Sequence, residues 1–226
     1  MIGKPREVEV ILLLFGPPGC GKGTQAAHLA ERFQIPVIST GEIFRAECKA
    51  GTELGRKSCG IMSGGGLVDD GIVNGMVAAR IARPDCAGGF LLDGYPRTVP
   101  QAEQFAAMLR ERGLPGPTVI HLDVAEEALV ARLTARRQCP KCLRIYNTLW
   151  QPPRQTGRCD DDGEPLITRE DDQEAVIRQR LAAYRELTGP VLGWYGDAAV
   201  RTVDGALPPE EVTRAIENAV LQTAAR

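Results

Sequence analysis

The chain has 226 residues, of which 43% are hydrophobic and 25% are charged, the composition of a soluble globular protein with one substantial core. Its formal net charge of −2 argues against a general nucleic-acid binder. No apolar run approaches the roughly 20 residues needed to cross a bilayer, so we expect no membrane partner.

Apolar runs alternate with helical patterns along the chain. The predicted strands are Val8–Leu14, Pro36–Ser39, Phe90–Asp93, Val119–Val124 and Val200–Val203. The predicted helices are Lys22–Arg32, Gly41–Ala50, Asp70–Arg83, Val99–Arg112, Glu126–Arg136, Asp172–Thr188 and Pro208–Leu221. This alternation predicts a three-layer α/β fold, a five-stranded parallel sheet with helices on both faces.

Two segments interrupt the alternation. Residues 39–83 contain short helical patterns separated by glycines, which indicates a small helical insertion on flexible joints. Residues 138–170 hold three of the seven cysteines and four prolines, with almost no helical period. A loop of that length inside a compact domain is usually a lid, a metal-binding module or disorder.

The first predicted strand runs directly into a glycine-rich turn. Its sequence is Gly16-Pro17-Pro18-Gly19-Cys20-Gly21-Lys22-Gly23-Thr24, the pattern of a phosphate-binding loop with an extra glycine between the lysine and the hydroxyl residue. Glycines let backbone N–H groups converge on an anion, and the helix beginning near Lys22 adds its positive dipole end. We expect Lys22 to contact the β- and γ-phosphates of a nucleotide and Thr24 to lie near Mg²⁺.

A second motif, Gly89 to Thr98, follows the same strand-then-turn plan. Asp93 ends a buried strand and is placed to orient a Mg²⁺ water, as the second acidic element of phosphate-loop enzymes does. Arg97 follows four residues later, and its planar guanidinium suits a pair of phosphate oxygens. Both motifs follow strands of one parallel sheet, so they should open onto the same crevice.

The cysteines of residues 138–170 form a third motif. Cys139, Cys142, Cys159 and Asp162 follow the pattern Cys-x₂-Cys-x₁₆-Cys-x₂-Asp, which can close a tetrahedron around a structural Zn²⁺. Asp160 and Asp161 are alternative fourth ligands, iron is an alternative metal, and a redox dithiol or free thiols are alternative interpretations. The other four cysteines are scattered, so we expect no disulfide framework and a cytoplasmic location.

Four motifs together resemble the adenylate kinases. They are the phosphate-binding loop, Ser39–Arg45, the Asp93–Thr98 element and Asp171–Glu174, and the match runs from about Val8 to the C-terminus. The resemblance implies a P-loop NTPase fold and reversible, Mg²⁺-dependent phosphoryl transfer from ATP to AMP, giving two ADP. It also implies a core formed by residues 1–38, 84–137 and 171–226, an NMP-binding insertion at 39–83 and a zinc-stapled lid at 138–170.

The resemblance further implies roles for single residues. ATP is expected to contact Arg132, which would stack on its adenine, and the loop residues Gly19, Cys20, Gly21, Lys22, Gly23 and Thr24. The γ-phosphate is expected to be surrounded by Arg136, Arg169 and Arg180, with Asp93 orienting the Mg²⁺ shell. AMP is expected to bind through a phosphate clamp, Arg45 and Arg97, and an adenine pocket, Thr40, Val68, Gly94 and Gln101. Asp171 and Asp172 resemble lid-hinge acids that pair with arginines.

Other functions remain open at this point. A GTP:AMP kinase and a UMP/CMP kinase use the same chemistry, but Thr40 and Gln101 favour AMP, and the long lid argues against the pyrimidine enzymes. A nucleotide switch with a zinc interaction module should lack an acceptor clamp such as Arg45 with Arg97. We expect a monomer. Two positions depart from the family pattern: Gly66 stands where many relatives have a lysine near the AMP site, and Tyr95 replaces the commoner phenylalanine.

Overall fold

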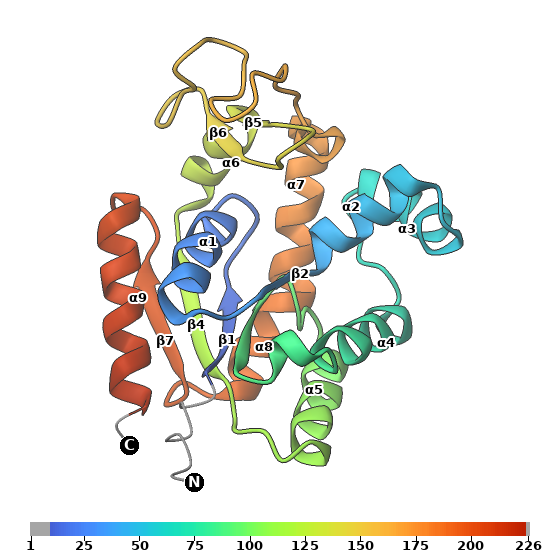
Figure 1. The fold of residues 1–226 in the computed structure, drawn as a ribbon, viewed down its shortest axis with the longest axis vertical. Coiled ribbons are helices and arrows are strands. Elements are labelled where there is room, and N and C mark those ends of the chain that lie inside the picture. The colour runs from blue at the N-terminus through green and yellow to red at the C-terminus, as the bar shows by residue number, and fades with distance from the viewer. Residues whose placement is uncertain (1–9, 225–226) are drawn as a thin grey trace, which may run out of the picture.

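The structure is a computed structural model that describes residues 10–224, so Val8 and Glu9 of the first predicted strand lie outside the described residues. Figure 1 shows a central sheet with helices on both sides, the lid (residues 138–170) at the top and a helical arm projecting to the right. Among the described residues, no helix combines the length and hydrophobicity that crossing a bilayer requires.

The central sheet has five parallel strands in the order β2-β3-β1-β4-β7. Their bounds are Val10–Phe15 (β1), Val37–Ser39 (β2), Gly89–Asp93 (β3), Thr118–Asp123 (β4) and Val200–Asp204 (β7). Since all four pairings are parallel, the carboxyl ends of the five strands lie at one edge of the sheet. The predicted five-stranded parallel sheet is confirmed.

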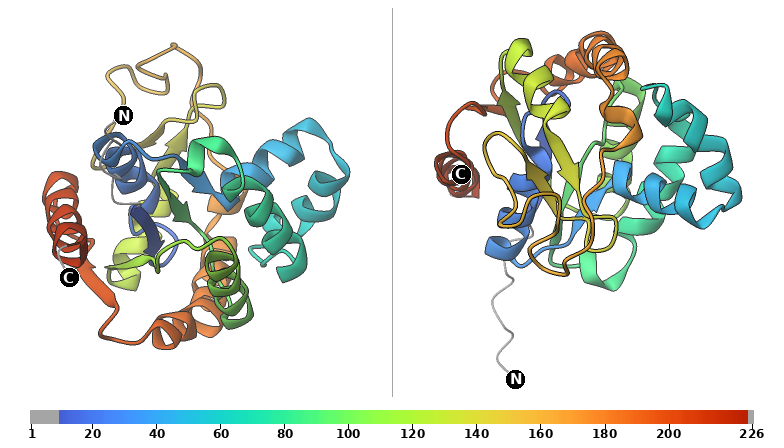
Figure 2. Two further views of the ribbon diagram at one scale, coloured as in Figure 1. Left: turned by 60° about the horizontal axis from the view of Figure 1, so that its bottom comes forward. Right: turned by 90° about the horizontal axis from the view of Figure 1, so that it is seen from above.

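The sheet is buried on both faces, which explains why β1 is a continuous apolar run. Leu13 and Phe15 pack with α4 (Asp70–Ile81), α5 (Val99–Glu111) and α8 (Gly189–Tyr195) on one side. The alternate residues Leu12 and Leu14 pack on the other side, with a cluster that draws on α1 (Lys22–Phe33), α6 (Glu126–Thr134), α7 (Glu174–Ala183) and α9 (Pro209–Ala224). Figure 2 shows these layers from two further directions.

The insertion begins with two helices, α2 (Thr40–Ala50), which was predicted as Gly41–Ala50, and α3 (Glu53–Ser63), which was not predicted. α3 contains Gly55 and Gly60, which lower intrinsic helix propensity. A Cβ at Gly55 would lie 2.2 Å from the carbonyl oxygen of Glu47, so this glycine allows the two helices to pack closely. Tertiary packing therefore outweighs propensity here.

A disulfide joins the same two helices and corrects the expectation that the cysteines outside the lid are scattered. Cys48 of α2 and Cys59 of α3 are bonded, with their Cα atoms 5.7 Å apart. The two residues are 11 positions apart, and the helical hairpin between them brings them together. Cys20 and Cys86 are free and buried.

The region after the lid differs from the single helix predicted over Asp172–Thr188. It contains a 3₁₀ turn at Glu170–Asp172, then α7, a π-helix at Tyr184–Thr188 and α8. Pro190 lies in the first turn of α8, where its missing N–H is tolerated. The predicted helix Glu126–Arg136 also ends earlier, at Thr134, and Arg136 begins strand β5.

The lid contains more regular structure than its sequence indicates. β5 (Arg136–Gln138) and β6 (Ile145–Asn147) form an antiparallel ribbon. An isolated bridge joins Gln138 to Ile167, and another joins Arg158 to Pro165. Short strands of this kind leave little periodic signal in a sequence.

Candidate active site

A cavity of about 1240 Å³ lies between the carboxyl edge of the sheet, the insertion and the lid. Most of the residues predicted to contact the nucleotides or Mg²⁺ line it: Gly19, Cys20, Gly21, Lys22, Gly23, Thr24, Arg45, Asp93, Gly94, Arg97, Arg132, Arg136, Arg169 and Arg180. The remaining three, Thr40, Val68 and Gln101, do not line it and are buried, with exposed fractions of 3%, 8% and 2%. The structure therefore gathers residues from all parts of the chain around one space.

The phosphate-binding loop has the backbone that its glycines predict. Gly16, Gly19 and Gly21 have φ values of 144°, 87° and 105°, a region that other residues seldom adopt. A Cβ at Gly16 would lie 2.7 Å from the carbonyl oxygen of Leu122, so the loop also approaches β4 closely. The Lys22 ammonium donates hydrogen bonds to the carbonyl oxygens of Gly16 (2.6 Å) and Pro17 (3.1 Å).

Two acidic residues at the end of the lid pair with arginines of the cavity. Arg136 binds both carboxylate oxygens of Asp172, with Nε donating to Oδ2 at 2.7 Å. Arg180 Nη1 lies 3.0 Å from Asp171 Oδ2 and 3.2 Å from Asp172 Oδ1. The structure thus brings the predicted hinge acids and arginines together.

A third carboxylate, Glu42 of α2, links the insertion to the end of the lid. Its Oε1 accepts hydrogen bonds from Arg45 (2.7 Å) and from Arg169 (2.8 Å). Sequence reasoning did not single out Glu42, although its i, i+3 spacing from Arg45 on a helix indicated a pair. The distant partner Arg169 carried no such signal.

The arginines remain short of negative charge despite these pairs. Burial, together with the charges of Arg136 and Arg45, lowers the pKa of Arg169 to about 10. Burial also lowers the pKa values of Arg97 and Arg180. The Nε atom of Arg45 is buried without a hydrogen-bond partner among the described residues. The positive charges around the cavity therefore favour the binding of an anion there.

Arg97 is held by the turn that follows β3. Gly94 has a φ of 82°, and the next peptide bond, Tyr95–Pro96, is cis. The Arg97 side chain turns back so that Nε donates to the Gly94 carbonyl oxygen at 2.8 Å. Its backbone N–H donates to Oε1 of Gln101 at 2.7 Å, and Thr40 donates to the Gly94 carbonyl oxygen at 2.8 Å.

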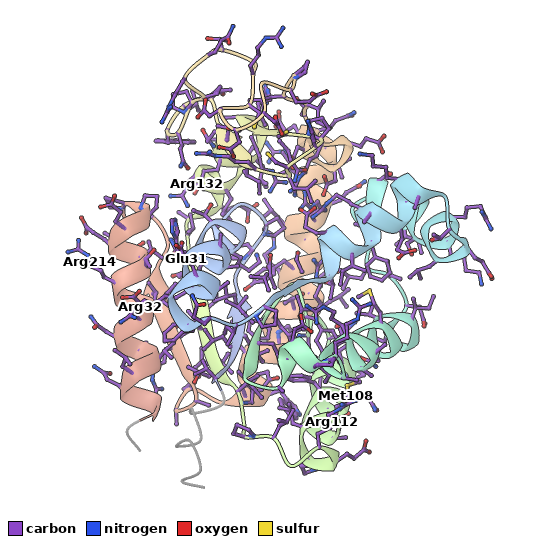
Figure 3. All side chains as sticks on the ribbon, in the orientation of Figure 1. Glu31, Arg32, Met108, Arg112, Arg132 and Arg214 are labelled. Atoms are coloured by element: carbon purple, nitrogen blue, oxygen red, sulfur yellow. A yellow bond between two sulfur atoms is a disulfide. The ribbon has the colours of Figure 1, made fainter. Side chains whose placement is uncertain are left out.

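Asp93 and Arg132 line the cavity from two different elements, β3 and α6. Asp93 ends β3, where the Ser39 hydroxyl donates to its Oδ2 at 3.5 Å. Arg132, near the end of α6, donates from Nη1 to the Gly205 carbonyl oxygen at 2.9 Å. Figure 3 places Arg132 below the lid and above α1.

The lid cysteines and Asp162 form a compact donor cluster. The sulfur atoms of Cys139, Cys142 and Cys159 and a carboxylate oxygen of Asp162 all lie within 4.8 Å of one another. The backbone N–H groups of Lys141 and Cys142 donate to the Cys139 sulfur at 3.4 Å each. Three thiols and a carboxylate that converge in this way form a possible metal site of the Cys₃Asp type.

Comparison with known proteins agrees with this architecture. A family model described as adenylate kinase matches residues 14–200. The chain belongs to the adenylate kinase family. It is 50% identical to the adenylate kinase of Oceanobacillus iheyensis over 186 residues, which is 82% of this chain and 86% of the relative.

Two further adenylate kinases are similar to it. The one from Anaeromyxobacter dehalogenans is 46% identical over 207 residues, covering 91% of this chain and 97% of the relative. The one from Trichlorobacter lovleyi is 50% identical over 184 residues, covering 81% and 86%. The chain is therefore an adenylate kinase, a nucleoside monophosphate kinase that transfers a phosphoryl group from ATP to AMP.

Proposed function

We propose that this adenylate kinase binds ATP on the side of the phosphate-binding loop and AMP on the side of the insertion, with their phosphates meeting in the cavity. On the ATP side, the amides of Gly19 to Thr24 and the Lys22 ammonium would hold the β- and γ-phosphates. Arg132 would stack on the adenine. These roles are supported by the positive φ values of the loop and by the place of Arg132 in the cavity wall.

On the acceptor side, Arg45 and Arg97 would clamp the AMP phosphate. Thr40, Gln101, Gly94 and the backbone near Val68 would enclose its adenine. Two contacts support this assignment: Gln101 and Thr40 both bond to the turn that carries Arg97. A base bound against Gln101 and a phosphate bound by Arg97 would then lie on one rigid element.

Phosphoryl transfer needs alignment and charge neutralisation more than covalent help from the protein. Arg136, Arg169 and Arg180 would neutralise the oxygens of the transferring group as the lid closes and excludes water. The bound phosphates would replace Glu42, Asp171 and Asp172, the carboxylates that now pair with these guanidinium groups. Adenylate kinases use Mg²⁺ with ATP, which offsets phosphate charge, and Asp93 with the Thr24 hydroxyl would hold its water shell.

One observation supports this proposal most strongly. Five arginines, Arg45, Arg97, Arg136, Arg169 and Arg180, line a single cavity. Three of them, Arg97, Arg169 and Arg180, have lowered pKa values, and the negative charges of two phosphate-bearing ligands would oppose that lowering. A site for one nucleotide would not need Arg45 and Arg97, the proposed acceptor clamp, in addition to Arg136, Arg169 and Arg180.

We further propose that the lid site holds a structural Zn²⁺ through Cys139, Cys142, Cys159 and Asp162. The lid has a small hydrophobic cluster, formed by Cys139, Tyr146 and Cys159 with Leu166 at its edge. A metal would therefore supply much of the stability that such a segment cannot obtain from burial.

A monomer in the cytoplasm is the assembly and location that we propose. The three lid cysteines support a reducing compartment, because they must be reduced to bind a metal. Such compartments usually keep thiols reduced, and this applies to Cys48 and Cys59 as well. We expect this pair to be partly or fully reduced in the cell.

A nucleotide-pair screen with metal analysis on the same sample tests these assignments. ATP with AMP and Mg²⁺ should give the fastest formation of diphosphates, ahead of GTP with AMP and of ATP with UMP or CMP. Zinc should be present at about one ion per chain. Folded, metal-loaded protein that forms no ADP from ATP and AMP would overturn the proposal.

A further inference from the structure

Asp70, the first residue of α4, binds two residues at the start of α5. Its Oδ1 accepts a hydrogen bond from Nε2 of Gln101 at 2.7 Å, and its Oδ2 accepts one from the Thr98 hydroxyl at 2.8 Å. Both partners belong to the turn and helix that follow β3, whereas Asp70 belongs to the insertion. The carboxylate therefore connects the two walls of the proposed adenine pocket.

Gln101 is held at both ends of its amide group. Its Oε1 accepts from the Arg97 backbone N–H at 2.7 Å, and its Nε2 donates to Asp70. If the amide were flipped, Nε2 would face another N–H donor and Oε1 would face a carboxylate, so both bonds would be lost. Only one orientation of the amide is compatible with its surroundings.

A fixed amide presents a fixed pattern to a ligand. Within the described part of the chain these two bonds use one Nε2 hydrogen and one Oε1 lone pair, leaving one donor and one acceptor. Adenine offers the complement, an acceptor at N1 and a donor at N6. Hypoxanthine and guanine offer the reverse, a donor at N1 and an acceptor at O6, and would meet two mismatched contacts.

We propose that Asp70 is a positioning residue that sets base specificity at the acceptor site by fixing the orientation of Gln101. This inference rests on the proposed function, in which Gln101 contacts the AMP base. A carboxylate can only accept hydrogen bonds, so it dictates which end of the Gln101 amide points toward it. An asparagine at this position could face either end, because it carries both a donor and an acceptor.

The test is Asp70→Asn, which keeps the size of the side chain and a hydrogen bond to each partner. Its matched control is Asp69→Asn, which removes the same charge from the same end of α4. Asp69 caps α4 by accepting from the N–H groups of Gly71 and Ile72, and asparagine caps equally well. The readout is the ratio of kcat/KM for AMP to kcat/KM for inosine monophosphate, with ATP as donor.

We expect Asp70→Asn to lower this ratio by about tenfold, the factor that one charge-assisted hydrogen bond represents. Asp69→Asn should leave the ratio unchanged. An unchanged ratio in Asp70→Asn, or an equal fall in both variants, would overturn the inference while leaving the proposed function intact. A wild-type protein with no activity on AMP would instead contradict the proposed function itself.

Discussion

Glu42 and Arg169 are 127 positions apart in the sequence, yet they form an ion pair of 2.8 Å between the insertion and the base of the lid. The same oxygen of Glu42 also accepts from Arg45. One carboxylate thus separates two cations that the proposed mechanism assigns to phosphates. The pair shows that the cavity holds its arginines in place with intramolecular anions.

This pair predicts an acid sensitivity. Burial raises the pKa of Glu42, but the hydrogen bond from Arg45 and the charges of Arg45 and Arg169 outweigh it and hold the pKa below the ordinary value of 4.5. A carboxyl group with a lowered folded-state pKa adds stability above its unfolded pKa and loses it as the pH falls through the folded value. Between about pH 5.5 and pH 3.5, the free energy of unfolding should therefore fall less in Glu42→Gln than in wild type. Urea unfolding at both pH values checks this, and equal losses would contradict it.

Arg97→Ala should reduce kcat/KM for AMP by at least about 100-fold, the cost of removing one charged donor from a phosphoryl-transfer site. Its melting temperature should change little, because the substitution also removes a buried charge next to Arg180 and Arg45. A coupled ADP assay and a thermal melt measure the two quantities. The control is Arg112→Ala, which lies at the end of α5 away from the cavity (Figure 3). Retained turnover with a large fall in melting temperature would show that Arg97 is structural.

The Cys48–Cys59 disulfide should stabilise the hairpin of α2 and α3. Closing a loop of this length is worth about 2–3 kcal/mol in the chain-entropy model. Reduction with a phosphine should therefore increase proteolytic cleavage within residues 40–63 of the wild-type chain. In the double variant Cys48→Ser/Cys59→Ser, cleavage should already be fast and should not respond to the reductant. A wild-type chain that is indifferent to reduction would contradict this prediction.

The lid metal can be tested with two neighbouring aspartates. Asp162→Asn should weaken zinc binding, because it removes an anionic ligand, and the lid should become easier to cleave with protease. Asp161→Asn should bind zinc as wild type does, because Asp161 is half exposed and pairs with Arg144 instead. Zinc content after dialysis against a weak chelator measures the difference. Equal zinc loss in both variants would remove Asp162 from the ligand set.

Short-range patterns predicted much of this structure. The buried strands, the glycine loop before Lys22 and the acid that ends β3 are each encoded within about ten consecutive residues, so the sequence predicts them directly. The lid cysteines follow a sequence spacing that is typical of metal ligands, and the structure brings them together as expected. Their neighbour Arg136 was misplaced on a helix because a strand of three residues has almost no period.

Contacts between distant segments could not be predicted in the same way. The α2–α3 hairpin depends on the absence of a Cβ at Gly55, which sequence reasoning interprets as a weak helix. The disulfide follows from that hairpin, and Glu42 meets Arg169 only because the insertion and the lid converge on one cavity. Such pairs depend on tertiary packing, which local propensity does not encode.

The central claim is that two nucleotides bind at once with their phosphates facing each other. The most direct measurement is the binding of a bisubstrate mimic, two adenosines joined by a chain of five phosphates, to the whole, zinc-loaded protein. The account predicts one mimic per chain, inhibition that is competitive with both ATP and AMP, and weaker binding in Arg97→Ala. Inhibition competitive with only one of the two nucleotides would contradict it.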